Sequence, residues 1–98
     1  MNISITGHQT DVSETLRHHV EQVLGSAIDK YFADSLSAHV TFSREAQSHR
    51  VHISVHVGHD INAEGHGDGL TASAAFGKAM EHVAKQLRRN KRKLREHH

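Results

Sequence analysis

The segment Leu70–Arg95, LTASAAFGKAMEHVAKQLRRNKRKLR, decides the fold because it predicts one long amphipathic helix. At about 100° per residue its apolar side chains share one stripe roughly 100° wide, which is typical of a helix that buries one side. The stripe consists of Ala72, Phe76, Ala79, Met80, Val83, Leu87 and Leu94. The rest of the chain must therefore supply an apolar layer that covers it.

The side of this helix opposite the stripe is predicted to be basic. Eight of the twelve Lys and Arg residues lie within residues 70–98, against two carboxylates. Because few Glu side chains stand one turn from a cation, internal pairing does not explain the charges, and we expect the face to bind an anion. A face that is charged only to be solvated is the alternative. The candidate residues are Lys78, His82, Lys85, Arg88, Arg89, Lys91 and Arg92, followed by Lys93 and Arg95.

Length and composition limit the class of protein. Ninety-eight residues fit one domain, residues 1–98. The absence of Cys excludes disulfides, thiolate zinc sites and a thiol nucleophile. We find no signal peptide and no apolar run of about 20 residues, so we expect a cytoplasmic protein that does not enter a membrane. Twelve histidines should make the chain more cationic on mild acidification, which should raise its affinity for anions.

The chain before residue 70 predicts four strands and one helix. Period-two alternation indicates strands over residues 2–7, 36–43, 51–57 and 61–65. A helix is expected from Asp11–Ser13 to Tyr31, with Ser13 as its N-cap. Gly25 inside that helix suggests that another backbone approaches closely there.

The connections between these elements are expected to be polar and short. We expect a loop over residues 44–49 and a tight turn over residues 58–60. Residues 65–69, GHGDG, are interpreted as a flexible hinge, after which Asp68 or Thr71 caps the last helix.

The order β-α-β-β-β-α predicts an α/β two-layer sandwich. A helix between the first two strands makes them parallel, whereas short connections make the later strands antiparallel neighbours. We therefore expect a four-stranded mixed sheet with both helices on one face and the other face open. This element order overlaps that of double-stranded-RNA-binding domains.

Short motifs along nearly the whole chain resemble the short ribosome hibernation-promoting factors, a family of ribosome-associated translation inhibitors. None of these motifs is specific alone, but together they occur in order and at matching spacing. They are Ile3-x-Ile5-x-Gly7, Leu16-Arg17, Lys30-Tyr31-Phe32, Val51-x-Ile53-x-Val55-x-Val57, Ala63-Glu64-Gly65, Ala84-Lys85-Gln86-Leu87 and Lys91-x-Lys93-Leu94.

The resemblance implies a factor that binds the small ribosomal subunit and the 70S ribosome in the messenger and transfer RNA channel and inhibits translation in slow growth or stress. Family members hold ribosomal RNA through basic residues of both helices, which here implies Lys78, Lys85, Arg88, Arg89, Lys91 and Arg92, with Arg17 and Lys30 from the first helix. The first helix departs from this pattern, because its exposed side carries Glu21 and Asp29 and few lysines. Some family members continue into a dimerisation domain, so a truncated long form is an alternative to a natural short form.

Two other functions remain open. The first is a general structured-RNA-binding domain, since phosphate contacts along a basic face need no base stacking and only four aromatic residues are present. The second is a histidine-rich metal-binding protein, because His39, His52 and His56 should share the open sheet face with Glu64. Residues two or four apart on one strand stand about 7 and 13 Å apart, so we expect no metal site. We also expect no cofactor, no small-molecule substrate and no catalysis, since Gly65-x-Gly67-x-Gly69 lacks the features of a phosphate loop.

Overall fold

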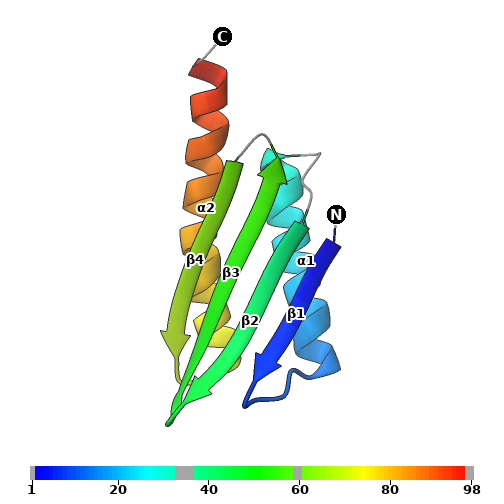
Figure 1. The fold of residues 1–98 in the computed structure, drawn as a ribbon, viewed down its shortest axis with the longest axis vertical. Helices are drawn as coiled ribbons and strands as arrows, with labels where there is room; N and C mark the ends of the chain where they lie inside the picture. The colour runs from blue at the N-terminus through cyan, green and yellow to red at the C-terminus, as the bar shows by residue number, and fades with distance from the viewer. Residues whose placement is uncertain (1, 33–36, 59–60, 97–98) are drawn as a thin grey trace.

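The computed structural model describes residues 2–32, 37–58 and 61–96, with side chains as far as residue 92. The elements follow the predicted order β-α-β-β-β-α (Figure 1). They are β1 (Asn2–His8), α1 (Glu14–Tyr31), β2 (Ser37–Glu45), β3 (Ser48–Gly58), β4 (Ile61–Gly69) and α2 (Ala72–Glu96). No helix in the described ranges is long and apolar enough to cross a membrane.

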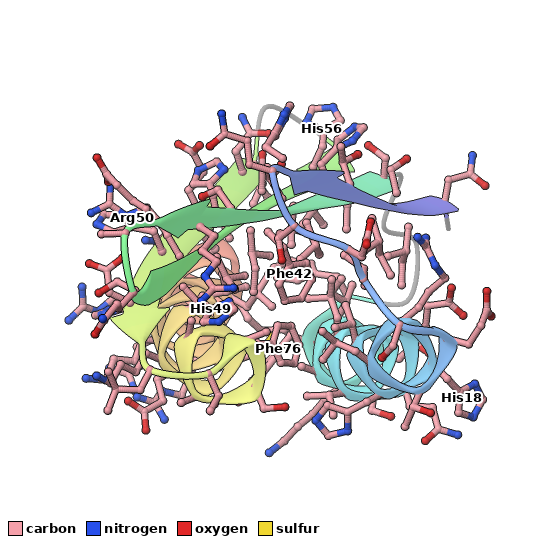
Figure 2. The ribbon with its side chains drawn as sticks, turned by 90° about the horizontal axis from the view of Figure 1, so that it is seen from below. His18, Phe42, His49, Arg50, His56 and Phe76 are labelled. Atoms are coloured by element: carbon pink, nitrogen blue, oxygen red, sulfur yellow. The ribbon has the colours of Figure 1, made fainter. Side chains whose placement is uncertain are left out.

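The four strands form one mixed sheet in the order β1-β2-β3-β4. β1 pairs with β2 in parallel, whereas β2 with β3 and β3 with β4 are antiparallel. Both helices lie on the same side of the sheet, and the other side is left open (Figure 2). The predicted two-layer sandwich is therefore confirmed.

The core lies between the sheet and the two helices. Phe42 of β2 and Phe76 of α2 stack near its centre with ring centroids 6.5 Å apart (Figure 2). The apolar stripe predicted for α2 is buried from Phe76 to Leu87, with Ala75 added and Ala72 half-buried, while the side chain of Leu94 lies outside the described part. The stripe packs on alternate residues of β2, β3 and β4, as the strand period requires.

Hydroxyl side chains cap the starts of both helices. The Oγ atom of Ser13 accepts a hydrogen bond from the backbone N–H of Leu16 at 3.1 Å, which confirms the predicted N-cap. At α2 the cap is Thr71 and not Asp68, because Thr71 Oγ1 accepts from the N–H of Ala74 at 3.0 Å. Asp68 belongs to β4.

The prediction of a flexible hinge over residues 65–69 is wrong, because these residues extend β4 to Gly69. Gly65, Gly67 and Gly69 alternate on the face of β4 that α2 covers. A Cβ atom built on Gly67 would lie 2.5 Å from the carbonyl oxygen of Ala75, and one on Gly65 would lie 2.7 Å from that of Ala79. The glycines therefore serve close packing of the α2 backbone on the strand.

Other element boundaries also differ from the sequence-based expectations. β2 continues to Glu45 and β3 begins at Ser48, so the loop predicted over residues 44–49 is a tight hairpin with Ala46 at φ 56°. A Cβ atom built on Gly25 would meet nothing within 4 Å, so the prediction that another backbone approaches α1 closely at this residue is wrong. Gly58 ends β3, while Leu36 and the remainder of the turn predicted over residues 58–60 lie outside the described residues.

We predict that Gly67→Ala lowers the free energy of unfolding by about 1–3 kcal/mol, because the added methyl group collides with the α2 backbone. Gly77→Ala is the matched control, since Gly77 lies in α2 with nothing within 4 Å of its would-be Cβ. That control should raise the stability by up to about 1 kcal/mol through helix propensity. Urea unfolding of both variants tests this, and a Gly67→Ala protein as stable as the wild type would refute the packing argument.

Candidate nucleic-acid interface

Four exposed basic side chains run along one flank of α2. Lys78, His82, Lys85 and Arg89 follow one another at three- or four-residue steps, which places them about one helical turn apart. We call this set the outer row. It lies beside β4 and not directly opposite the buried stripe, because the Cβ atoms of Lys78 and His82 stand over Gly67 and Gly65.

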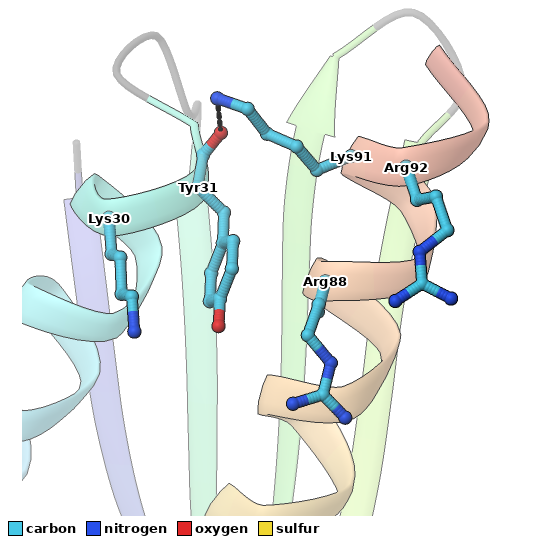
Figure 3. Close-up of a pocket in the computed structure, with 5 residues that line it drawn as sticks. All are labelled: Lys30, Tyr31, Arg88, Lys91 and Arg92. Atoms are coloured by element: carbon cyan, nitrogen blue, oxygen red, sulfur yellow. Dashed lines mark hydrogen bonds between the residues drawn. The ribbon is translucent and has the colours of Figure 1, made fainter. Parts of the chain in front are cut away.

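A second group of cations lines a groove between the two helices. The groove has a volume of about 300 Å³ and is lined by Lys30, Tyr31, Arg88, Lys91 and Arg92 (Figure 3). No carboxylate is among these lining residues. The Nζ atom of Lys30 lies 5.4 Å from the ring centroid of Tyr31, so the ring contacts one of the cations. We call this site the inter-helix groove.

Lys91 has a structural contact as well as a charge. Its ammonium group donates a hydrogen bond to the carbonyl oxygen of Tyr31 at 2.7 Å (Figure 3). It also lies 5.9 Å from the ring centroid of Phe32, the residue that ends α1. Because the carbonyl end of a helix carries partial negative charge, Lys91 ties α2 to the C-terminus of α1.

Arg17 does not join these cations. Its guanidinium donates a hydrogen bond to the carbonyl oxygen of Ile5 at 3.4 Å, so it lies against the edge strand β1. The first helix therefore contributes Lys30 to the inter-helix groove and places Arg17 on a different flank. The side chains of Lys93 and Arg95 lie outside the described part of the chain.

The cations of α2 take part in neither of the two ion pairs formed by described side chains. Those pairs are Arg50 with Asp68 at 2.7 Å and His52 with Glu64 at 3.1 Å, both on the open sheet face. The expectation that α2 is not internally paired is therefore met as far as residue 92. This leaves the outer row and the inter-helix groove available for an external anion.

The open sheet face does not gather a metal site. His39, His52 and His56 are all exposed on it, as predicted, and His56 Nδ1 lies 2.6 Å from Asn62 Oδ1. Within the described ranges, no three His, Asp or Glu side chains stand close enough to hold one ion. The hypothesis of a histidine-rich metal-binding protein therefore has no geometric support.

Two amide side chains to which the sequence analysis gave no structural role position the outer row. The amide of Gln86 accepts a hydrogen bond from the backbone N–H of Glu64 at 2.8 Å and donates one to the carbonyl oxygen of the same residue. Asn90 donates to the carbonyl oxygen of Asn62 at 3.4 Å. Gln86 and Asn90 lie on the same side of α2 as the buried residues Ala79 and Val83. A polar residue within this apolar stripe is the sequence signal that could have identified them.

Comparison with known proteins supplies the family. Residues 3–95 match the family described as "Sigma 54 modulation protein / S30EA ribosomal protein". The chain belongs to this family. The family description and the names of its relatives point to ribosome-associated factors.

Relatives within the family carry the name that the sequence resemblance predicted. The ribosome hibernation promoting factor of Salmonella typhimurium is 31% identical over 98 residues, which cover 99% of this chain and 100% of the relative. The ribosome hibernation promotion factor of Rhizobium meliloti is 26% identical over 98 residues, which cover 100% of this chain. This chain spans about half the length of the Rhizobium protein, 52%, and 47% of a Bradyrhizobium diazoefficiens relative.

Solved structures show the same fold. A ribosomal subunit interface protein from Coxiella burnetii superposes with a TM-score of 0.79 at 18% identity, covering 93% of this chain and 98% of that one. The N-terminal domain of Thermus thermophilus Protein Y gives 0.80 at 24% identity, covering 91% and 98%. Both solved structures therefore share the overall fold described above.

We predict that Lys91→Ala lowers the free energy of unfolding by about 1 kcal/mol, because it removes the hydrogen bond to Tyr31 and the favourable charge at the end of α1. Lys85→Ala is the control, since Lys85 is exposed on the outer row of the same helix. Its effect should stay within about 0.5 kcal/mol. Equal losses in urea unfolding would show that Lys91 has no special structural role.

Proposed function

We propose that this chain is a ribosome hibernation factor that acts in the cytoplasm. In this proposal it binds the small ribosomal subunit, alone and within the 70S ribosome, at the messenger and transfer RNA channel. Its presence there blocks translation during slow growth or stress. Family membership supports the ribosome as the partner, and the names of the relatives support hibernation as the outcome.

The observation that carries the proposal is a pair of cationic surfaces, one on α2 and one between α1 and α2. The outer row presents Lys78, His82, Lys85 and Arg89, and the inter-helix groove presents Lys30, Arg88, Lys91 and Arg92. Basic side chains that meet successive phosphates release condensed counterions, which gives tight binding that weakens as salt rises. A rigid helix seated on a sheet holds these charges at fixed positions, so a folded RNA of matching shape is favoured over an arbitrary strand.

A general structured-RNA-binding domain is the competing function. Both functions use the same cations, so they differ in what competes for binding. Co-sedimentation with small subunits and with 70S ribosomes across a salt series, with a plain RNA duplex as competitor, separates them. Stoichiometric pelleting that the duplex does not displace supports the ribosome factor, whereas displacement at equal concentration supports the general RNA binder.

We predict that Lys85→Glu with Arg89→Glu abolishes co-sedimentation with small subunits. Both side chains are exposed on the outer row, so the fold should remain intact while two attractions become repulsions. Arg44→Glu is the charge-reversal control, since Arg44 lies next to the β2–β3 turn and outside α2. Retained pelleting of the double variant would rule out the outer row as the binding surface.

We predict a different result for the two basic residues of α1. Lys30→Gln should weaken binding to small subunits by about tenfold, the cost of one charge-assisted phosphate contact, because Lys30 lines the inter-helix groove. Arg17→Gln should change the affinity by less than about twofold, because Arg17 is turned toward β1. Filter binding at fixed salt measures both, and an equal loss would place the first helix flat against the RNA.

A further inference from the structure

The open face of the sheet is a regular array of polar side chains. The strand register aligns four residues across β1, β2, β3 and β4 in each of four rows. The rows are Asn2, Ser37, His56 and Asn62; Ser4, His39, Ser54 and Glu64; Thr6, Thr41, His52 and His66; and His8, Ser43, Arg50 and Asp68. Neither helix covers this face, so in the described part of the chain it is open to solvent (Figure 2).

Five of the twelve histidines lie on this array, and four of them surround Ser54. His52 and His56 flank Ser54 on β3, His39 is its register partner on β2, and His66 is the register partner of His52 on β4. Side chains of register partners on one sheet face are about 5 Å apart, and diagonal neighbours about 7–8 Å. The four imidazoles therefore form one continuous patch, with His8 farther off on β1.

The charge of this face depends on those histidines. Its permanent charges are Arg50 against Glu64 and Asp68 of the rows and Glu45, which pairs with Ser48 on the same face beyond the fourth row. They give a net charge of −2 while the imidazoles are neutral. Five protonated imidazoles change this net charge to +3. The hydrogen bond from Arg50, and then the charges of Arg50, His66 and Lys78, lower the pKa of Asp68, so this carboxylate stays ionised at mildly acidic pH.

We propose that the open sheet face is a second RNA-binding surface, which binds phosphates when its histidines are protonated. Charge complementarity selects the partner: a patch of four imidazolium groups among hydroxyl and amide side chains, with His8 farther off, offers hydrogen-bond donors to phosphate oxygens. The array contains no Phe, Tyr or Trp, and its protonated imidazoles donate hydrogen bonds to phosphate oxygens, so the RNA backbone is the part that it recognises.

This inference rests on the proposed function, because the RNA that reaches the open face is the RNA bound by α2. The two surfaces lie on different layers of the sandwich, with the helices on one side and the histidine patch on the other (Figure 2). A protein inserted in a channel lined by RNA can therefore contact both walls of it. The outer row of α2 binds at every pH through Lys and Arg, and the open face adds contacts when its histidines are protonated.

The test compares the binding of small ribosomal subunits at pH 7.5 and at about pH 5.8, at constant ionic strength, because acidification favours the protonated form of imidazole. The central variant is the triple substitution His39→Gln, His52→Gln and His56→Gln, which keeps polar side chains at exposed positions. His18→Gln is the control, since His18 is exposed on α1 away from the sheet (Figure 2). Circular dichroism melts at both pH values confirm that each variant is folded.

The wild type and His18→Gln should bind about tenfold tighter at the lower pH, with a salt dependence steeper by about two units, because each added phosphate contact contributes about 0.7–0.9 to the slope. The triple variant should match the wild type at pH 7.5 and gain at most about threefold on acidification, the part that His82 on the outer row and the remaining His8 and His66 of the open face supply. An equal gain in the triple variant and the wild type overturns the proposal.

The same pH comparison in a second variant separates this inference from the proposed function. In the double variant Lys85→Glu with Arg89→Glu, binding of small subunits should be absent at pH 7.5 and return in part at the lower pH. Adding the three histidine substitutions to this double variant should abolish the binding at the lower pH. If the double variant binds like the wild type at pH 7.5, the basic-face mechanism of the proposed function fails. The comparison of the triple variant with the wild type still decides the role of the open face in that case.

Discussion

The close approach of the α2 backbone to β4 is the constraint on which the rest of the structure depends. Gly65, Gly67 and Gly69 leave no side chains between the strand and the helix, so backbone atoms of Ala75 and Ala79 take that space. The amide of Gln86 then bonds to both backbone groups of Glu64 at the outer edge of the strand. Packing and hydrogen bonding together fix the rotation of α2, and that rotation directs the outer row to solvent.

The position of α2 on the sheet also determines where the two helices meet. Past β4, Asn90 reaches the carbonyl oxygen of Asn62, and Lys91 reaches that of Tyr31 at the end of α1. These contacts bring Arg88 and Arg92 to the groove that Lys30 lines from the other helix. These like charges repel one another, and an anion bound in the groove would lower their electrostatic energy. Structural contacts of α2 thus hold the cations of the inter-helix groove in place.

The sequence predicted the elements, the mixed sheet and the two-layer arrangement because their apolar periods are strong and agree with one another. It failed at residues 65–69, where glycine was weighed as a source of flexibility although Glu64, His66 and Asp68 kept the alternation of a strand. It also could not show that Arg17 and Lys30 face different neighbours, because that depends on the rotation of α1 against β1 and α2. The rotation of a helix about its axis depends on tertiary packing, and the apolar periodicity of its own sequence does not determine it.

The alternation in β4 connects the two sides of the molecule. Its inward residues are small, so they admit α2, and its outward residues are polar, so they extend the open array with Glu64, His66 and Asp68. A side chain larger than glycine inside the strand would push α2 away, whereas a change outside would leave the packing intact. The open face is therefore free to vary in charge without cost to the fold. A change of charge there leaves the packing of α2 on the strand, and so the position of its Lys and Arg side chains, unchanged.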